Sequence, residues 1–159
     1  MKWTFQLALH ERMRQDPRIH LLYGDVGQQM FAAIIKEFPD RALNVGLMEQ
    51  SMVSFAAGMA MSGLRPVCYS ILPFLIERAF EQIKLDVDQM NLPVGIVGYS
   101  DDECGPTHQV ASTHESRSVM NQLEEITQFW PESKERVTEY MQRIDLNHPW
   151  FMALGPERK

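Results

Sequence analysis

The stretch IHLLYGDVG, residues 19–27, sets the fold of this chain. Five residues suited to a buried strand run directly into a loop that contains two glycines, and residues 29–38 then carry a helical pattern that ends at Pro39-Asp40. A buried strand, a glycine-containing loop and a helix in this order open a βα unit. The sequence therefore predicts a sheet built from such units.

The same alternation continues along the chain. We predict further strands at residues 42–45, 66–71, 93–98, 125–129 and 149–154, and helices at residues 3–14, 49–61, 74–90, 119–123 and 131–144, the last capped by the proline at its start. Strands that alternate with helices at this pitch are parallel, with the helices as crossovers. The expected fold is therefore α/β, a doubly wound, mostly parallel sheet of about six strands with helices on both faces.

Length and composition limit the class of protein. The 159 residues fit a single domain, 1–159, and 45% hydrophobic with 23% charged residues is the composition of a chain that buries a core. A formal net charge of -6 without a basic stripe argues against a nucleic-acid partner. The longest apolar stretch, residues 54–61, is too short for a membrane span, which needs about 20 apolar residues.

Cysteine usage and the first residues predict the compartment. Cys68 and Cys104 form no CxxC pair, and the chain starts without the apolar run of a signal peptide. These features predict a reduced, cytoplasmic protein.

Glu49 is the first candidate site residue. In a doubly wound sheet, ligands bind at the carboxyl ends of the strands, and Glu49 lies where the strand at 42–45 turns through Gly46 into an apolar helix. Two interpretations stay open. In the first, an acid in the first helical turn interacts favourably with the helix dipole and stabilises the helix by about 0.3–1 kcal/mol. Alternatively, a desolvated carboxyl at this position shares a proton with a bound heterocycle.

His108 is the second candidate. It lies in CGPTHQ, residues 104–109, within the longest segment that lacks clear periodicity, and Gly105 and Pro106 set the backbone just before it, the proline by fixing its own φ. Long loops beyond strand ends tend to be functional. A loop histidine of this kind is either a surface residue or a catalytic one.

Four motifs together carry a resemblance to a known family. They are DRALNVGLMEQSMV at 40–53, PVCYS at 66–70 with PFL at 73–75, RAFEQI at 78–83, and GPTHQ at 105–109. In this order they resemble the pyrimidine-binding domain of transketolases and of their 1-deoxyxylulose-phosphate synthase relatives. The resemblance covers essentially the whole chain, and the fold it implies is the one predicted above.

The resemblance implies thiamine diphosphate as the cofactor, whose thiazolium ylide performs the carbon chemistry. Glu49 matches the glutamate that hydrogen-bonds the aminopyrimidine nitrogen N1′ and stabilises the imino tautomer that removes the C2 proton. Phe74 matches the aromatic residue that stacks on the pyrimidine, although Leu72 or Leu75 is an alternative at that position. His108 matches a histidine that contacts the substrate, and Asp25 matches an acidic position lining the same cleft.

Departures from the family pattern shape the functional expectation. The chain has no Gly-Asp-Gly run with a downstream Asn, so the resemblance implies that a partner holds the magnesium ion and the diphosphate, with no metal ligand in this chain. We also expect the diphosphate-binding and C-terminal transketolase domains to be absent. Ser100 and Cys104 lie near positions where transketolases place a histidine and an aspartate that touch the sugar, so the resemblance does not imply ordinary sugar-phosphate specificity.

The resulting expectation is the pyrimidine-binding subunit of a two-component transketolase-like enzyme. It would transfer a two-carbon ketol unit from a ketose to an aldehyde, as a heterotetramer with a diphosphate-binding subunit, and would form a homodimer when alone. Two alternatives stay open: a subunit of a 2-oxo acid decarboxylase or acyloin synthase, and a non-catalytic scaffold partner.

Overall fold

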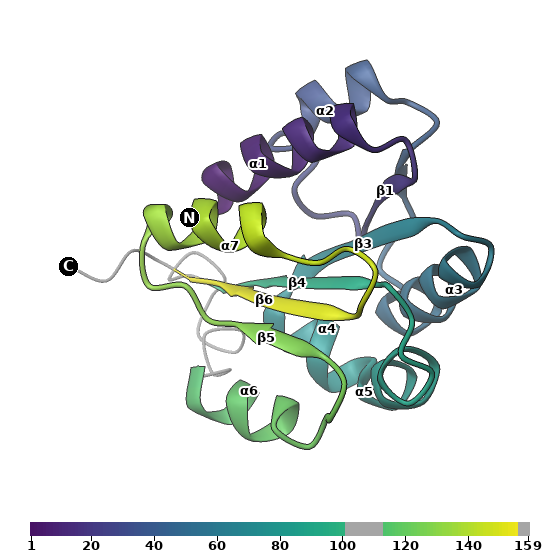
Figure 1. Ribbon diagram of the computed structural model, residues 1–159, viewed down its shortest axis with the longest axis vertical. Helices are drawn as coiled ribbons and strands as arrows, with labels where there is room; N and C mark the ends of the chain where they lie inside the picture. The colour runs from purple at the N-terminus through teal and green to yellow at the C-terminus, as the bar shows by residue number, and fades with distance from the viewer. Residues whose placement is uncertain (101–112, 156–159) are drawn as a thin grey trace.

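A six-stranded parallel sheet forms the centre of the molecule in the computed structural model, which describes residues 1–100 and 113–155 (Figure 1). Its strands are β1 (Ile19–Tyr23), β2 (Ala42–Asn44), β3 (Arg65–Ile71), β4 (Gly95–Tyr99), β5 (Thr127–Phe129) and β6 (Trp150–Leu154). They lie in the order β2-β1-β3-β4-β6-β5, and every neighbouring pair within the described residues is parallel. The predicted α/β class and the parallel sheet are confirmed.

Helices cover both faces of this sheet (Figure 1). One face carries α1 (Lys2–Gln15), α2 (Ala32–Glu37) and α7 (Lys134–Arg143), and the other carries α3 (Glu49–Met61), α4 (Leu72–Arg78), α5 (Phe80–Gln82), the π-helical η1 (Ile83–Asp88) and α6 (Thr113–Met120). Each face has its own hydrophobic cluster, so the core is two layers with the sheet between them.

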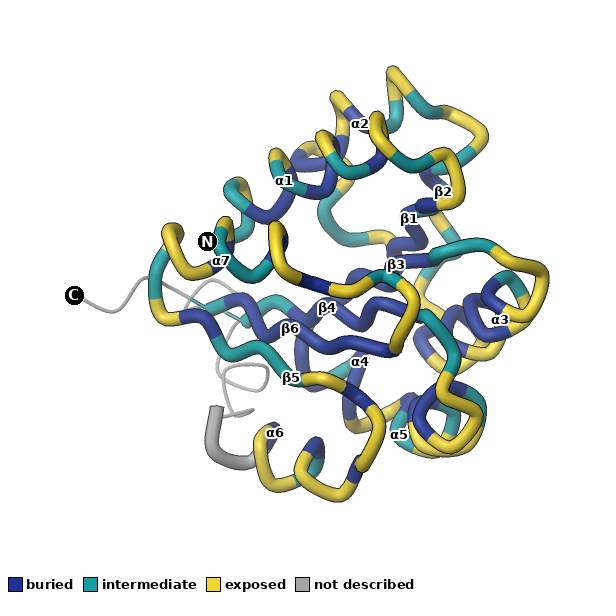
Figure 2. The backbone as a smooth tube through the Cα atoms, viewed as in Figure 1, coloured by how far each residue is buried: buried dark blue, intermediate teal, exposed yellow. Residues whose placement is uncertain are grey.

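The inner strands β1, β3, β4 and β6 are mostly apolar because both of their faces are largely buried, whereas the edge strands β2 and β5 are partly exposed (Figure 2). Along β1, Leu21 and Tyr23 pack toward α1 and α2, whereas Leu22 packs toward α3 and α4. On β3, Val67 and Cys68 divide in the same way. Successive side chains of a strand point to opposite faces of the sheet. Because helices cover both faces, apolar residues occupy both sets of positions and do not alternate with polar ones.

Three predicted helices differ from the structure. Residues 74–90 form no single helix, because the helical run is interrupted at Ala79 and continues as the short α5 and the wider turns of η1. The helix predicted at 119–123 lies earlier, as α6, which ends at Met120. The expected proline cap of the helix at 131–144 is also wrong, because α7 begins at Lys134 and the Ser133 hydroxyl accepts the Arg136 N–H instead.

The strand order fixes where a ligand site lies. The chain leaves β1 toward β2 at one edge of the sheet, and it leaves β3 toward β4 in the opposite direction. The carboxyl ends of β1 and β3 therefore form a topological switch point, which is where open α/β sheets bind ligands. Among the helices of the described residues, none is long and apolar enough to cross a bilayer.

Candidate functional site

Three chain segments meet closely at the switch point. A Cβ placed on Gly24, just after β1, would lie 3.3 Å from the carbonyl oxygen of Gly46 and 3.4 Å from the Ser70 hydroxyl of β3. Gly46 itself has a φ of 76°, a left-handed conformation that glycine adopts without strain. The two glycines thus bring the loops after β1 and β2 against the carboxyl end of β3.

Glu49 lies inside this convergence as the first residue of α3. Its side chain is 2% exposed. The Ser70 hydroxyl donates a hydrogen bond of 2.9 Å to Glu49 Oε1, and Ser70 is itself buried. On the other side, Arg78 Nη1 donates to Glu49 Oε2 at 3.4 Å. Burial separates Glu49 from an ordinary first-turn acid, which favours the helix dipole from an exposed position.

Phe74 joins the same group through Arg78. The Arg78 guanidinium carbon lies 3.7 Å from the centroid of the Phe74 ring, a cation–π contact. Both residues belong to α4, at a spacing of four that places them on one face of the helix. The guanidinium therefore contacts both predicted pyrimidine-binding residues at once: Nη1 donates to Glu49, and the guanidinium carbon lies over the Phe74 ring.

Asp25 lies at the same edge of the sheet but in a different set of contacts. Its side chain is exposed, Asn44 Nδ2 donates to Asp25 Oδ1 at 3.1 Å, and Asp25 N–H donates to Asn44 Oδ1 at 3.1 Å. Asp25 also has a φ of 55°, in the left-handed region that Asp and Asn adopt more readily than other residues with a Cβ. The Asn44 side chain thus joins the loops after β1 and β2, with Asp25 at their outer surface.

His108, predicted to contact substrate, lies outside the described residues, as does Cys104. The structure therefore brings together Glu49 and Phe74, and leaves the role of His108 as a prediction.

Two residues of this site had no role in the sequence analysis, Ser70 and Arg78. Ser70 is the single polar side chain in an otherwise apolar stretch at the end of a strand, which is a usable signal in a parallel sheet. Arg78 follows Phe74 by four residues, so helical periodicity already places it beside the aromatic ring. That it also reaches Glu49, 29 residues earlier, follows only from the tertiary structure.

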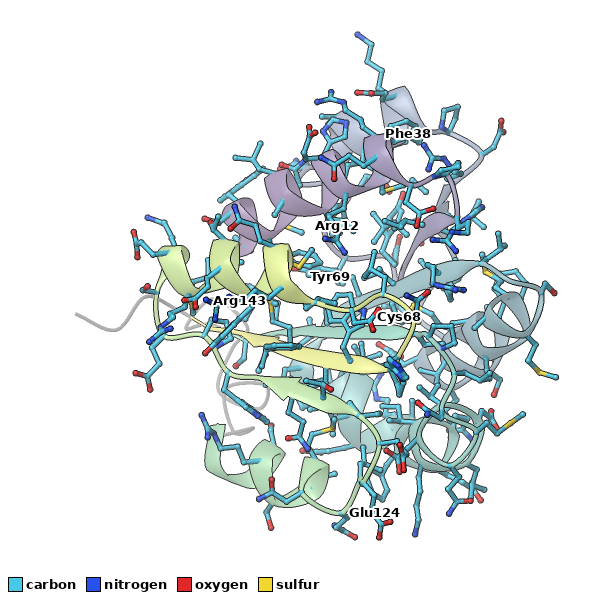
Figure 3. All side chains as sticks on the ribbon, in the orientation of Figure 1. Arg12, Phe38, Cys68, Tyr69, Glu124 and Arg143 are labelled. Atoms are coloured by element: carbon cyan, nitrogen blue, oxygen red, sulfur yellow. The ribbon has the colours of Figure 1, made fainter. Side chains whose placement is uncertain are left out.

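Other titratable groups near the sheet do not join this site. Cys68, labelled in Figure 3, is buried on β3, and burial raises the pKa of its thiol. Burial, with a smaller contribution from the Asp25 carboxylate, also raises the pKa of Tyr23. Within residues 1–100 and 113–155 there is no group of three His, Cys, Asp or Glu side chains arranged to hold a metal ion.

Comparison with known proteins identifies the family. Residues 1–154 match the family described as transketolase, pyrimidine binding domain. The chain belongs to this family, as the four motifs indicated.

Individual relatives agree with this assignment. One subunit of the apulose-4-phosphate transketolase of Actinobacillus succinogenes is 50% identical over 86 residues, which cover 54% of this chain and 27% of that protein. A 1-deoxy-D-xylulose-5-phosphate synthase of Prochlorococcus marinus is 48% identical over 81 residues, 46% of this chain and 12% of that protein. These matches span about a third or less of the curated relatives' own length.

Solved structures agree on the fold. A split gene transketolase, described as an inactive beta4 tetramer, superposes with a TM-score of 0.81 at 26% identity, over 97% of this chain and 50% of that one. A transketolase from Campylobacter jejuni superposes with the same TM-score, 0.81, at 16% identity, over 97% of this chain and 25% of that one, and supports the fold alone.

Membership of this family implies thiamine diphosphate as cofactor, and the described residues fit its pyrimidine ring. A buried carboxyl, a hydroxyl that fixes one of its oxygens, and an aromatic ring lie together at the switch point. The planar, nitrogen-bearing guanidinium of Arg78 already makes the two contacts that an aminopyrimidine requires, one with a carboxyl oxygen and one with an aromatic face. The chemistry of the site thus suits a flat nitrogen heterocycle.

Proposed function

We propose that this chain is the pyrimidine-binding subunit of a two-component, thiamine-diphosphate-dependent transketolase-like enzyme. In this proposal the enzyme transfers a two-carbon ketol unit from a ketose to an aldehyde. The family match supports the domain type, and the descriptions of two similar proteins, one as a transketolase subunit and one as a split gene transketolase, support the two-chain organisation.

The observation that carries the proposal is the buried Glu49 carboxyl at the switch point. Burying a carboxyl is costly unless its oxygens are hydrogen-bonded. A buried carboxyl at the ligand-binding ends of the strands therefore suggests a functional role. Binding a pyrimidine ring is such a role, because a ring nitrogen exchanges a proton with a carboxyl. When bound, thiamine diphosphate supplies the nucleophilic carbon and the electron sink for the reaction.

Each residue of the site has a distinct part in this proposal. Glu49 holds a proton at the pyrimidine N1′, and the hydrogen bond from Ser70 fixes the orientation of the carboxyl. Phe74 supplies an apolar face for the ring and excludes water from it. His108 donates a proton to the substrate oxygen, and Asp25 lines the mouth of the cleft from the neighbouring loop.

In this proposal the partner is a diphosphate-binding subunit that holds the magnesium ion, and the similar proteins described as a transketolase subunit and a split gene transketolase support it. We propose a heterotetramer of the two subunits in the cytoplasm. The chain by itself would self-associate into a homodimer, since a cleft built for an aminopyrimidine exposes apolar surface when it lacks a partner.

Reconstitution tests the proposal. This chain is mixed with a diphosphate-binding transketolase subunit, magnesium and thiamine diphosphate, and ketol transfer is measured on a panel of ketose donors and aldehyde acceptors. We expect activity in the mixture and none from either chain alone. Turnover of 2-oxo acids in place of ketoses would contradict the ketol-transfer assignment and favour the decarboxylase or acyloin alternative. Activity unchanged by Glu49→Gln would favour a scaffold role.

A further inference from the structure

Arg78 contacts the two residues, Glu49 and Phe74, that are proposed to bind the cofactor ring. Its guanidinium carbon lies over the Phe74 ring, 3.7 Å from the centroid, and its Nη1 donates to Glu49 Oε2 at 3.4 Å. A guanidinium and an aminopyrimidine are both flat, both stack on aromatic rings, and both direct nitrogen groups at a carboxyl. A ring that binds Glu49 and this face of Phe74 therefore meets Arg78 in the same place.

We propose that Arg78 is a placeholder for the aminopyrimidine, meaning a side chain that occupies the ring position in the free chain and leaves when the cofactor binds. The inference rests on the proposed function, and it adds a competing residue to the site. Among residues 1–100 and 113–155, Arg78 is the cation that contacts Glu49, and a buried carboxylate without a cation beside it is a costly state. Arg78 neutralises Glu49 until the heterocycle takes over its contacts.

The burial of Glu49, Ser70 and Arg78 indicates which side chain can move when a ring binds. The side chains of Glu49 and Ser70 are enclosed, whereas that of Arg78 is 50% exposed. Arg78 is also the last residue of α4, just before the helical run is interrupted at Ala79. A long side chain at a helix end, open to solvent, can rotate outward without disturbing the core.

The hydrogen bond to Glu49 is weak enough to be exchanged. Charge-assisted N–H···O bonds are typically about 2.7–2.9 Å long. Arg14 Nη2 reaches Glu37 Oε2 at 2.6 Å in this same chain, whereas the Arg78 contact is 3.4 Å. Arg78 thus balances the charge of Glu49 without a tight bond that the cofactor would have to break.

Thiamine is a suitable probe, because it carries the aminopyrimidine but no diphosphate and so does not need the partner's metal site. We would titrate it into the purified full chain by calorimetry. If the guanidinium covers the ring position about nine-tenths of the time, removing it strengthens binding by about tenfold, since apparent affinity scales with the fraction of competent molecules. The variant is Arg78→Ala.

The control is Arg143→Ala, which removes the same charge from α7. Arg143, labelled in Figure 3, lies on the molecular surface, where its Nη1 contacts Glu139 Oε1 at 2.8 Å. The affinity of the Arg143→Ala variant for thiamine should equal that of the parent chain. The double variant Glu49→Gln with Arg78→Ala should lose most of the gain, because the ring then lacks its acid. An arginine with a merely structural role would leave thiamine binding unchanged or weakened on removal.

A second measurement does not require Arg78→Ala to fold. The side-chain Nε–Hε resonance of Arg78 is assigned in the parent chain by its loss in Arg78→Lys, and thiamine is then added to saturation. We expect the resonance to move toward the position of a solvent-exposed arginine. An unmoved resonance, equal or weaker binding by Arg78→Ala, or no thiamine binding by any variant would overturn the placeholder.

The outcomes also separate this inference from the proposed function. A reconstituted enzyme whose ketol transfer depends on Glu49, combined with no gain in Arg78→Ala, rejects the placeholder and leaves the function standing. A gain of affinity in Arg78→Ala, combined with no ketol transfer on the substrate panel, supports the placeholder and rejects the reaction.

Discussion

Two buried carboxylates, one near the amino ends of the strands and one at their carboxyl ends, show how the same chemical group takes different roles. Asp88 ends η1 at the amino edge, where its oxygens accept the backbone N–H groups of Glu124, Glu125 and Ile126 at 2.9–3.2 Å, just before β5. Figure 3 labels Glu124 in this loop. Glu49 begins α3 at the carboxyl edge and is bound by a hydroxyl and a half-exposed guanidinium.

The difference lies in the donors. Backbone N–H groups are fixed by the chain and leave only if the loop unfolds, so Asp88 is a structural tie between η1 and β5. The partners of Glu49 are side chains, and Arg78 is open to solvent. A ligand can replace a side-chain partner but not a backbone one. The comparison predicts that changes at Asp88 affect stability and changes at Glu49 affect activity.

The largest expected effect is that of Glu49→Gln in the reconstituted complex. Glutamine keeps the size and the hydrogen-bonding reach but cannot exchange a proton with the ring nitrogen, so the rate should fall by at least about 10²–10⁴-fold, the range for a general acid–base group. The measurement is exchange of the C2 proton of bound thiamine diphosphate for deuterium, followed by quenching and NMR. Exchange as fast as in the parent, in a folded and cofactor-loaded complex, would contradict the assignment.

His108, which follows β4 in the sequence and lies outside the described residues, extends the comparison. We expect His108→Ala to lower kcat/KM in the reconstituted enzyme by about 10²–10⁴-fold, because a proton donor to the substrate is lost. The affinity for thiamine diphosphate should stay nearly unchanged, since the predicted contact is with substrate. An unchanged rate would reassign His108 to a structural role.

Asp88→Asn should have the opposite effect to that expected of Glu49→Gln, lowering stability rather than activity. An amide keeps one acceptor oxygen but points N–H groups at a site that holds three backbone donors, so at least one donor is left unpaired in a buried position. We expect a loss of about 1–3 kcal/mol in the free energy of unfolding. Urea denaturation of the free chain measures it, with the exposed Asp145→Asn as a control. A full loss of activity at unchanged stability would break the comparison.

The smallest expected effect is a pH dependence at a third acid, Glu37 of α2. The Arg14 guanidinium, with a smaller contribution from His10, lowers the pKa of Glu37 from its ordinary 4.5 to about 2. Because the folded-state pKa is the lower one, the stabilisation is fully present above about pH 4.5 and is lost as the pH falls toward 2.

Urea midpoints of the parent and of Glu37→Gln at pH 5.5 and 3.5 test this. The difference between the two proteins should be small, since Glu37 is on the surface, and it should shrink at the lower pH. A difference that grows on acidification would have the wrong sign for this pair.

Most of the fold followed from local sequence. The strand at 19–23 and the helix at 49–61 have the predicted boundaries, because an apolar run between turn signals and an apolar helix after a glycine are strong local patterns. The helical run at 74–90 was predicted as one element, since periodicity does not register the wider turns of η1. The cap of α7 was misplaced because Pro131 and Ser133 are both acceptable starts.

For the site, sequence alone determined the candidate residue types and the edge of the sheet on which they lie. Glu49 and Phe74 follow from their positions after strands and from the family motifs. The tertiary structure alone decided that Ser70 and Arg78 hold the two oxygens of Glu49, and that Asp25 is bound to Asn44. The physical reason is distance along the chain. Helical and strand periodicity relate residues a few positions apart, whereas these contacts span 19 to 29 residues and exist only because β1, β2 and β3 end side by side.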